Sequence, residues 1–271
     1  MTKRLIPAQR YNLILEYLEI HQVAQSTVLS ELLQVSEATV RRDLESLEQQ
    51  GSLERTHGGA TLNRRLLLEP EYSDSVLTHP DEKRYIGVRA AALVEDGDTI
   101  FVNSGTTATQ VVRHLRDHAG VTVITNNVSA AMEVQEAGFE LLLLGGSFRA
   151  RAKSVAGRFA TDALRQIYAS KAFIGVDGLS LKYGCTTPID AEAELARLMI
   201  ERTHGPVIVV ADHSKWGIVS NFEMARLDQI DMLVSDTGLD AGAQAALEAR
   251  SVRVLLAGPE PAGNGHYLSG G

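Results

Sequence analysis

The chain has 271 residues, 44% of them hydrophobic, which is enough for two domains, one of them with a sizeable core. Residues 1–65 hold 8 basic and 8 acidic side chains, so the net charge of −8 lies in residues 66–271, and only the N-terminal part suits a polyanion. The single cysteine, Cys185, excludes an intrachain disulfide, and no apolar run is long enough to cross a bilayer. We therefore expect a cytoplasmic protein with no metal, no cofactor and no membrane contact.

Residues 1–62 are predicted to form three short helices and a hairpin. Pro7 suits the first turn of a helix with one apolar face. Ser26 is a candidate N-cap for a second helix, and Ser36 is a candidate N-cap for a third. The stretch "SLERTHGGATL" at 52–62 then alternates around a Gly-Gly pair, which is typical of a hairpin.

The third predicted helix has the features of a helix that reads DNA. Short side chains in its first turn let the backbone approach base edges, and arginines on its open face bind guanine or phosphate. The hairpin adds basic residues beside a flexible glycine tip, as in a wing. The residues that we expect to contact DNA are Ser36, Glu37, Ala38, Thr39, Arg41, Arg42, Arg55, His57 and Gly58. A three-helix unit that binds another protein is the alternative, because a net charge of zero is low for a DNA-binding domain.

Residues 63–82 lack sustained periodicity and contain two prolines, so we expect a linker between a domain at 1–62 and a second at 83–271. In the second domain, strand-like runs alternate with helical patterns, which is typical of an α/β domain around a largely parallel sheet. The strand-like runs are 99–103, 121–125, 139–144, 172–176, 207–211, 232–235 and 252–256. The helical patterns include 128–137, 158–167, 190–203 and 240–249.

Polar or glycine-rich motifs follow five consecutive predicted strands, where open α/β sheets bind ligands. The first motif, "NSGTT", opens a helix, and the backbone N–H groups of a helix N-terminus favour an anion such as phosphate. Taken singly the motifs are ambiguous, because a Gly-Gly pair is often a turn, an Asn pair a helix cap and a lysine a surface residue. The residues that we expect to bind an anionic ligand are Ser104, Gly105, Thr106, Thr107, Asn126, Gly146, Arg149, Asp177 and Lys215.

The number and position of acidic residues indicate whether the pocket only binds its ligand or also catalyses a reaction. General acid and base catalysis needs a positioned carboxylate with a charged partner, but no second carboxylate follows Asp177 closely. Asp190, Glu192 and Glu194 are interpreted as first-turn acids that stabilise their helix. We therefore expect a pocket that binds without catalysis, with an enzyme carrying a DNA-binding extension as the alternative. The basic run "SFRARAKSVAGR" at 147–158 is either a solvated loop or part of a ligand site or interface. His213 is expected to be structural, and Cys185 to be buried.

The segment "VSEATVRRDLESLEQQGSLERTHGGA" at 35–60 resembles the winged helix-turn-helix signature of the DeoR-type family of bacterial transcriptional repressors. The family pattern has a V-S-x-x-T-[IV]-R-R-D-L core, a leucine, a glycine and an R-x-H-G-G-A wing, and every element is present. Asp43, which directly follows two arginines, is expected to pair with a neighbouring arginine and orient it.

The resemblance continues through the C-terminal half, where "SGTT", "TNN", "LLGGSFR", "GVDGL" and "ADHSKWG" look like successive motifs of the family's effector-sensing domain. It implies an N-terminal winged helix-turn-helix and a C-terminal α/β effector domain with a fold like ribose-5-phosphate isomerase and CoA-transferase. It also implies a repressor of a carbohydrate-metabolism operon whose binding to double-stranded operator DNA responds to a phosphorylated sugar or sugar acid. Two operator half-sites require a homodimer or homotetramer. Asn103 stands where the family has an acidic residue.

Overall fold

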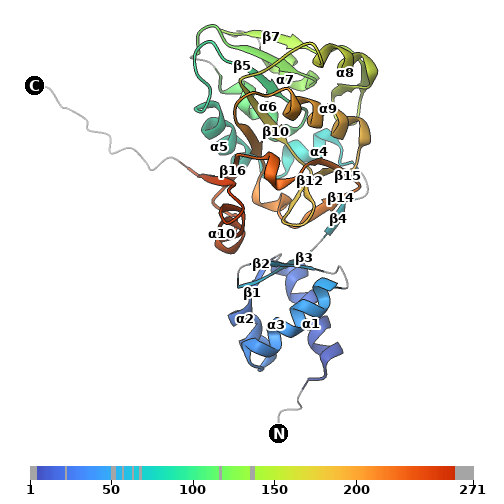
Figure 1. Ribbon diagram of the computed structural model, residues 1–271, viewed down its shortest axis with the longest axis vertical. Helices are drawn as coiled ribbons and strands as arrows, with labels where there is room; N and C mark the ends of the chain where they lie inside the picture. The colour runs from blue at the N-terminus through green and yellow to red at the C-terminus, as the bar shows by residue number, and fades with distance from the viewer. Residues whose placement is uncertain are drawn as a thin grey trace, which may run out of the picture.

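A computed structural model shows an N-terminal helical unit followed by a larger α/β unit (Figure 1). The structure describes residues 5–21, 23–49, 53–56, 58–62, 64–66, 69–115, 118–134 and 138–259. No helix within these ranges is long and apolar enough to cross a membrane.

The N-terminal unit contains the three predicted helices and the predicted hairpin. The helices are α1 (Pro7–His21), α2 (Ser26–Leu33) and α3 (Glu37–Gln49), and the hairpin is β2 (Leu53–Thr56) and β3 (Gly59–Leu62). A third strand, β1 (Val23–Gln25), pairs with β3 and was not predicted, because three residues carry no alternating pattern. The helices and the sheet share one core, in which Ile14, Leu29 and Leu44 are buried.

The first residues of α2 and α3 show that one of the two predicted N-caps is correct. Ser36 caps α3, since the backbone N–H of Thr39 donates to its Oγ over 3.3 Å. Ser26 is instead the first residue of α2, and Gln25 precedes it without a side-chain cap. The prediction for Ser26 is wrong by one position, because β1 pairs with β3 up to Gln25 and the Ser26 N–H donates to the carbonyl oxygen of Gly58.

The α/β unit is built on a seven-stranded parallel sheet with the order β17-β16-β13-β10-β5-β6-β7. Each of its strands coincides with one of the predicted runs. The bounds are β5 (Thr99–Val102), β6 (Thr122–Thr125), β7 (Glu140–Leu143), β10 (Lys171–Gly175), β13 (Val207–Val210), β16 (Met232–Asp236) and β17 (Arg253–Ala257). The parallel sheet therefore confirms the predicted fold class.

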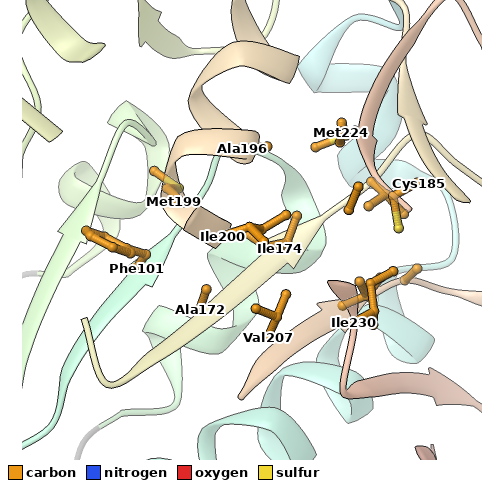
Figure 2. Packing of buried hydrophobic residues seen from close by; sticks show 14 of the residues in the cluster. Phe101, Ala172, Ile174, Cys185, Ala196, Met199, Ile200, Val207, Met224 and Ile230 are labelled. Atoms are coloured by element: carbon orange, nitrogen blue, oxygen red, sulfur yellow. The ribbon is translucent and has the colours of Figure 1, made fainter. Parts of the chain in front are cut away.

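Helices cover both faces of this sheet, so alternate residues of one strand enter different cores. Ile100 and Val102 of β5 pack in the core beneath α5 and α6, whereas Phe101 packs in the core beneath α8 and α9. Figure 2 shows the second core, with Met199 and Ile200 of α9 near the sheet residues. The helices are α5 (Pro80–Ala91), α6 (Thr106–Arg113), α7 (Val128–Glu133), α8 (Arg158–Leu164), α9 (Asp190–Glu201) and α10 (Ala241–Glu248).

The α/β unit also contains short elements that the sequence did not predict. β8 (Ser147–Arg149) pairs with β9 (Ser154–Ala156), and β11 (Gly178–Ser180) pairs with β12 (Gly184–Thr187), which pairs in turn with β15 (Phe222–Ala225). The 3-10 helices are η1 (His213–Lys215) and η2 (Leu227–Gln229). At three to four residues, these strands are too short for a period of two to show.

The segment expected to be a linker contains regular structure. β4 (Arg64–Leu66) pairs in parallel with β14 (Ile218–Ser220), α4 spans Tyr72–Leu77, and α5 begins at Pro80. Tyr72 is buried, and its hydroxyl lies 3.3 Å from Oγ1 of Thr109 in α6. Residues 69–82 are therefore packed on the α/β unit, while the domain boundaries themselves remain a prediction.

Candidate functional site

The open face of α3 presents the residues predicted to contact DNA. Ser36, Glu37, Ala38, Arg41 and Arg42 are exposed and Thr39 is half-buried, because the apolar positions of the helix face the core. Arg41 lies 3.6 Å from the carboxylate of Glu37. The guanidinium of Arg42 forms no ion pair within the described part of the chain. This face combines short side chains and free positive charge, the composition that a recognition helix requires.

The β2–β3 hairpin lies beside the C-terminal half of α3. The Arg55 guanidinium pairs with Glu45 at 2.9 Å, and the Arg55 backbone N–H donates to the carboxylate of Glu48. Gly58 at the tip is exposed, with a φ of +99° that side chains rarely adopt. His57 lies outside the described residues. The hairpin is thus fixed to α3 on the side where a wing belongs.

Asp43 does not pair with either of the two arginines that precede it in the sequence. Its two carboxylate oxygens accept from Nε and Nη2 of Arg10 in α1, at 2.6 and 2.8 Å. Arg41 and Arg42 point to solvent, but Asp43 is on the buried side of α3, with 4% of its surface exposed. The expectation that it orients a neighbouring arginine is wrong, since it joins α1 to α3 through a bidentate ion pair.

In the α/β unit, a pocket lies at the carboxyl ends of β5 and β10. Its walls are the loops that follow these two strands, the start of α9, the end of η1 and the segment that precedes α5. Of the nine residues predicted to bind an anion, Ser104, Gly105, Thr106, Thr107, Asp177 and Lys215 line this pocket. The walls also include Glu69, Tyr72, Ser75, Asn103 and Glu192. The strand ends therefore bring the predicted loop motifs together.

The loop after β5 leaves backbone donors without partners inside the helix. Gly105 is the N-cap of α6, no side chain caps the helix, and the first intrahelical bond runs from the Thr109 N–H to the carbonyl of Gly105. The N–H groups of Thr106, Thr107 and Ala108 thus have no intrahelical acceptor. A Cβ added to Gly105 would meet no atom within 4 Å. This end of α6 opens onto empty space and favours an anion.

Asn103 holds this loop against the neighbouring strand. Its Nδ2 donates to the Gly175 carbonyl over 2.8 Å, and its Oδ1 accepts from the Gly175 N–H over 2.7 Å. An ionised carboxylate at this position accepts but does not donate, so it cannot make both bonds. The amide at position 103 therefore joins the ends of β5 and β10 without adding a charge.

Glu192 has a role in the pocket that the sequence interpretation missed. It lies in the first turn of α9 as expected, but it is only 8% exposed and lines the pocket. Its Oε2 accepts from the Ser104 hydroxyl (2.7 Å) and from Nδ2 of Asn126 (3.1 Å). Its Oε1 accepts from the Ser154 hydroxyl (2.5 Å) and from Nη1 of Arg149 (2.8 Å). Glu192 is thus the centre of a polar network as well as an acid in the first turn of its helix.

The three remaining predicted residues lie behind the pocket wall. Asn126 is fully buried and contacts Glu192. Arg149 lies between Glu192 and Glu69, with its Nη2 at 2.6 Å from the Glu69 carboxylate. Gly146 has a φ of +153°, and a Cβ there would lie 2.7 Å from the Ala156 carbonyl oxygen, so this glycine permits the close approach of β8 and β9. Asn126 therefore contacts the pocket lining through Glu192, and Arg149 contacts it through both Glu192 and Glu69.

Burial changes the titration of several groups at the pocket. Burial raises the pKa of Asp177, although Lys215 and the Thr187 hydroxyl favour its charged form. Burial also raises the pKa of Glu69, against the effect of Arg149. Burial therefore disfavours the charged forms of these two carboxyl groups.

Lys83 of α5 is a cation that the sequence did not indicate, since it follows two acidic residues in an amphipathic helix. It is 4% exposed, and its Nζ donates to the backbone carbonyl of Ser75, a residue that lines the pocket. Burial lowers the pKa of Lys83 to about 8, with Asp212 opposing and Lys215 adding to the decrease. Lys83 therefore titrates close to neutral pH beside the pocket.

Two other candidates have structural roles. Burial raises the pKa of Cys185 to about 12, so this thiol is not a nucleophile. His213 lies with Nδ1 at 2.8 Å from Asp236, and this hydrogen bond raises its pKa. No group of three or more His, Cys, Asp or Glu residues suited to a metal ion occurs among the residues that the structure describes.

A helix with exposed arginines beside a hairpin, joined to an α/β unit with an anion-favouring pocket, defines a DNA-binding regulator with a sensor domain. Comparison with known families agrees: residues 10–65 match the DeoR-like helix-turn-helix domain and residues 78–237 match the DeoR C terminal sensor domain. The chain belongs to the DeoR-type family of transcriptional repressors.

Relatives match over most of their length. The HTH-type transcriptional regulator GlpR of Haloferax volcanii is 33% identical over 93% of this chain and 98% of its own length. The HTH-type transcriptional repressor GlcR of Bacillus subtilis is 36% identical over 84% of this chain and 88% of its own length. A putative aga operon transcriptional repressor of Escherichia coli O157:H7 is 33% identical over 93% of this chain and 94% of its own length. These relatives are regulators, in agreement with the expectation of a protein that is not an enzyme.

Solved structures are similar only at a low level. Ribose 5-phosphate isomerase A of Methanocaldococcus jannaschii is 18% identical over 51% of this chain and 55% of its own, with a TM-score of 0.38. The eIF2B delta structure of Chaetomium thermophilum is 16% identical over 57% of this chain and 60% of its own, with a TM-score of 0.39.

Proposed function

We propose that this protein represses a carbohydrate-metabolism operon, and that a phosphorylated sugar or sugar acid in the pocket weakens its binding to operator DNA. The observation that carries the proposal is the uncapped start of α6, where the N–H groups of Thr106 and Thr107 face a pocket that also holds Lys215. A phosphate there accepts hydrogen bonds from the backbone and neutralises the lysine.

The rest of the pocket suits the hydroxyl groups of a sugar. Asp177 and Glu192 are carboxylates, which accept hydrogen bonds from hydroxyls, and the hydroxyls of Ser104 and Thr187 add donors and acceptors. Tyr72 adds an aromatic side chain to the wall. A ligand with one strongly anionic end and several hydroxyls matches this distribution.

The DNA contact belongs to the exposed face of α3 and to the hairpin. We infer that Ser36, Ala38 and Thr39 approach base edges, while Arg41 and Arg42 bind guanine or phosphate. Glu37, Arg55, His57 and Gly58 complete the predicted surface. The name of the Escherichia coli O157:H7 relative, a putative aga operon transcriptional repressor, supports an operon as the target.

A single winged helix contacts too little DNA for tight specificity, so we propose a homodimer or homotetramer that binds two half-sites. Because its target is chromosomal DNA, its place of action is the cytoplasm. Coupling between pocket and operator of about 1–3 kcal/mol changes DNA affinity about five- to 150-fold, which is enough for a switch.

The fluorescence of Trp216 tests the ligand assignment. Trp216 is the only tryptophan, is 4% exposed, and directly follows Lys215. Titration with a panel of phosphorylated and unphosphorylated sugars is expected to change the signal only with phosphorylated members. Turnover of an aldose phosphate to a ketose phosphate would contradict the sensor function.

A further inference from the structure

The chain that joins the two units passes along the wall of the pocket. We define the strap as residues 69–77, which follow β4 and end with α4. Glu69, Tyr72 and Ser75 of the strap line the pocket. Because the strap lies on the covalent path from β3 to α5, a change in its position reaches the DNA-binding unit directly.

Contacts with β8 and the turn after it hold the strap in place. The Glu69 carboxylate pairs with Arg149 at 2.6 Å, and the Glu69 carbonyl accepts from Nε of Arg151 at 2.6 Å. The Tyr72 N–H donates to the Arg151 carbonyl over 2.9 Å, and Lys153 lies over the Tyr72 ring, 5.0 Å from its centroid. Part of the basic run at 147–158 is therefore an interface with the strap.

One chain of ion pairs and hydrogen bonds connects the anion loop to the strap. Ser104 donates to Glu192, Glu192 pairs with Arg149, and Arg149 pairs with Glu69. Ser104 belongs to the loop proposed to hold phosphate, and Glu69 belongs to the strap. Arg149 is the shared partner of two carboxylates, each with little of its side chain exposed.

These carboxylates make the pocket unfavourable for the ligand that it is proposed to bind. Glu69, Asp177 and Glu192 line the pocket together with Lys215, and Arg149 lies behind the wall, paired with Glu69 and Glu192. Glu192 accepts hydrogen bonds from Ser104, Asn126, Ser154 and Arg149, whereas Arg149 is the only side chain found to contact the Glu69 carboxylate among the described residues. Glu69 is therefore the carboxylate that an entering anion displaces most easily.

We propose that the effector anion competes with Glu69 for Arg149, so that filling the pocket releases the strap and thereby weakens DNA binding. This proposal rests on the proposed function, since it requires an anion at Ser104–Thr107. A second attachment supports it: β4 pairs with β14, in the register Arg64 with Ile218, and β14 begins three residues after Lys215. Both ends of the connection to the DNA-binding unit are thus attached to the α/β unit, β4 to β14 and the strap to β8 and the turn after it.

Hydrogen exchange of the full-length protein, read at single amides with and without inorganic phosphate at constant ionic strength, tests the proposal. We expect slower exchange at Thr106–Ala108 and, at the same time, several-fold faster exchange at Tyr72 and Ser75, whose N–H groups now bond to Arg151 and Glu71. Slower exchange at the loop with an unchanged or protected strap would overturn the strap proposal and leave the anion site standing. No protection of the loop by phosphate or by any sugar phosphate of the panel would overturn the anion site, and the strap proposal with it.

A pair of variants tests the competition without relying on exchange. Glu69→Gln removes the competing charge, and we expect phosphate to bind about tenfold more tightly and operator DNA to bind more weakly even without ligand. Asp74→Asn is the matched control: it removes one exposed carboxylate from the same strap, away from Arg149, and leaves both affinities unchanged. Wild-type affinities for both phosphate and DNA in Glu69→Gln would overturn the proposal.

Discussion

The Ser104 hydroxyl donates to the carboxylate of Glu192 over 2.7 Å, although the two residues are 88 positions apart. This bond joins the loop that opens α6 to the first turn of α9 across the end of the parallel sheet. The same carboxylate holds Arg149, so the anion loop and the chain that leads to the DNA-binding unit belong to one polar network.

Removal of this carboxylate is expected to destabilise the sensor unit. Glu192→Ala leaves Arg149 with one partner fewer and the buried Ser154 hydroxyl without the acceptor that it has in the wild type. It also leaves the Asn126 amide with the Val155 carbonyl but without the carboxylate, and we expect a total cost of about 3 kcal/mol. Glu194→Ala is the matched control, because Glu194 is exposed on the same helix and its loss costs less than about 0.5 kcal/mol. Chemical denaturation followed by circular dichroism measures both. Equal stability of the two variants would refute the structural role of Glu192.

Arg42 is expected to matter for DNA and not for ligand. Arg42→Ala removes from α3 an exposed guanidinium that has no ion-pair partner among the described residues. Operator affinity is expected to fall by about 1–3 kcal/mol, while the Trp216 response to ligand stays unchanged. If Arg42 binds phosphate, the salt dependence of DNA binding also decreases. Arg165→Ala, on the surface of the sensor unit, serves as the control. Normal operator binding by Arg42→Ala would contradict the assignment of α3 as the recognition helix.

Gly105→Val is expected to abolish the response to ligand and preserve DNA binding. The added side chain projects into the space proposed for phosphate, at a φ of +122° that disfavours any side chain. Gly97→Val separates these two effects, because Gly97 also has a positive φ and open surroundings but does not line the pocket. Fluorescence titration of both variants provides the measurement. A normal response in Gly105→Val would place the phosphate elsewhere.

Ligand affinity is expected to depend on pH through Lys83. Its pKa of about 8 means that it is charged below pH 8 and neutral above, so affinity for a dianionic sugar phosphate falls as the pH rises through about 8. The charge of a phosphate monoester is constant in this range, because its second pKa is about 6. Binding near pH 8 is also accompanied by proton uptake, which calorimetry in two buffers detects. Lys83→Gln is expected to remove the decline; an unchanged pH profile in this variant would exclude Lys83 as the cause.

The parts of the fold that the sequence predicted are those with a strong local signal. Strands such as Val207–Val210 are buried on both faces and therefore appear as continuous apolar runs, and the helix at Glu37–Gln49 has a regular apolar face. β4 and β14 carry no such signal, because each is three residues long and they form a two-stranded sheet only by pairing with each other. Their pairing depends on residues more than 150 positions apart.

The sequence predicted the site residues that follow strand ends, and it missed those whose position depends on the orientation of a helix. Ser104–Thr107 and Asp177 come directly after strands, so the sheet topology places them together. Glu192 was assigned by its place in the first turn, yet its spacing from Leu195, Ala196 and Met199 is that of the buried face of α9. That spacing was the sequence signal that could have indicated the burial of Glu192. Nothing in the local sequence indicated that Glu69 or Lys83 would reach the pocket.

The affinity of the full-length protein for fluorescent operator DNA, measured with and without each sugar phosphate, tests the central claim most directly. At least one phosphorylated sugar is expected to raise the Kd for DNA by about five- to 150-fold, its unphosphorylated counterpart is expected to have no effect, and Gly105→Val is expected to abolish the response. A sugar phosphate that binds the pocket, as judged by protection of the Thr106 and Thr107 amides, and leaves the Kd for DNA unchanged would contradict the account.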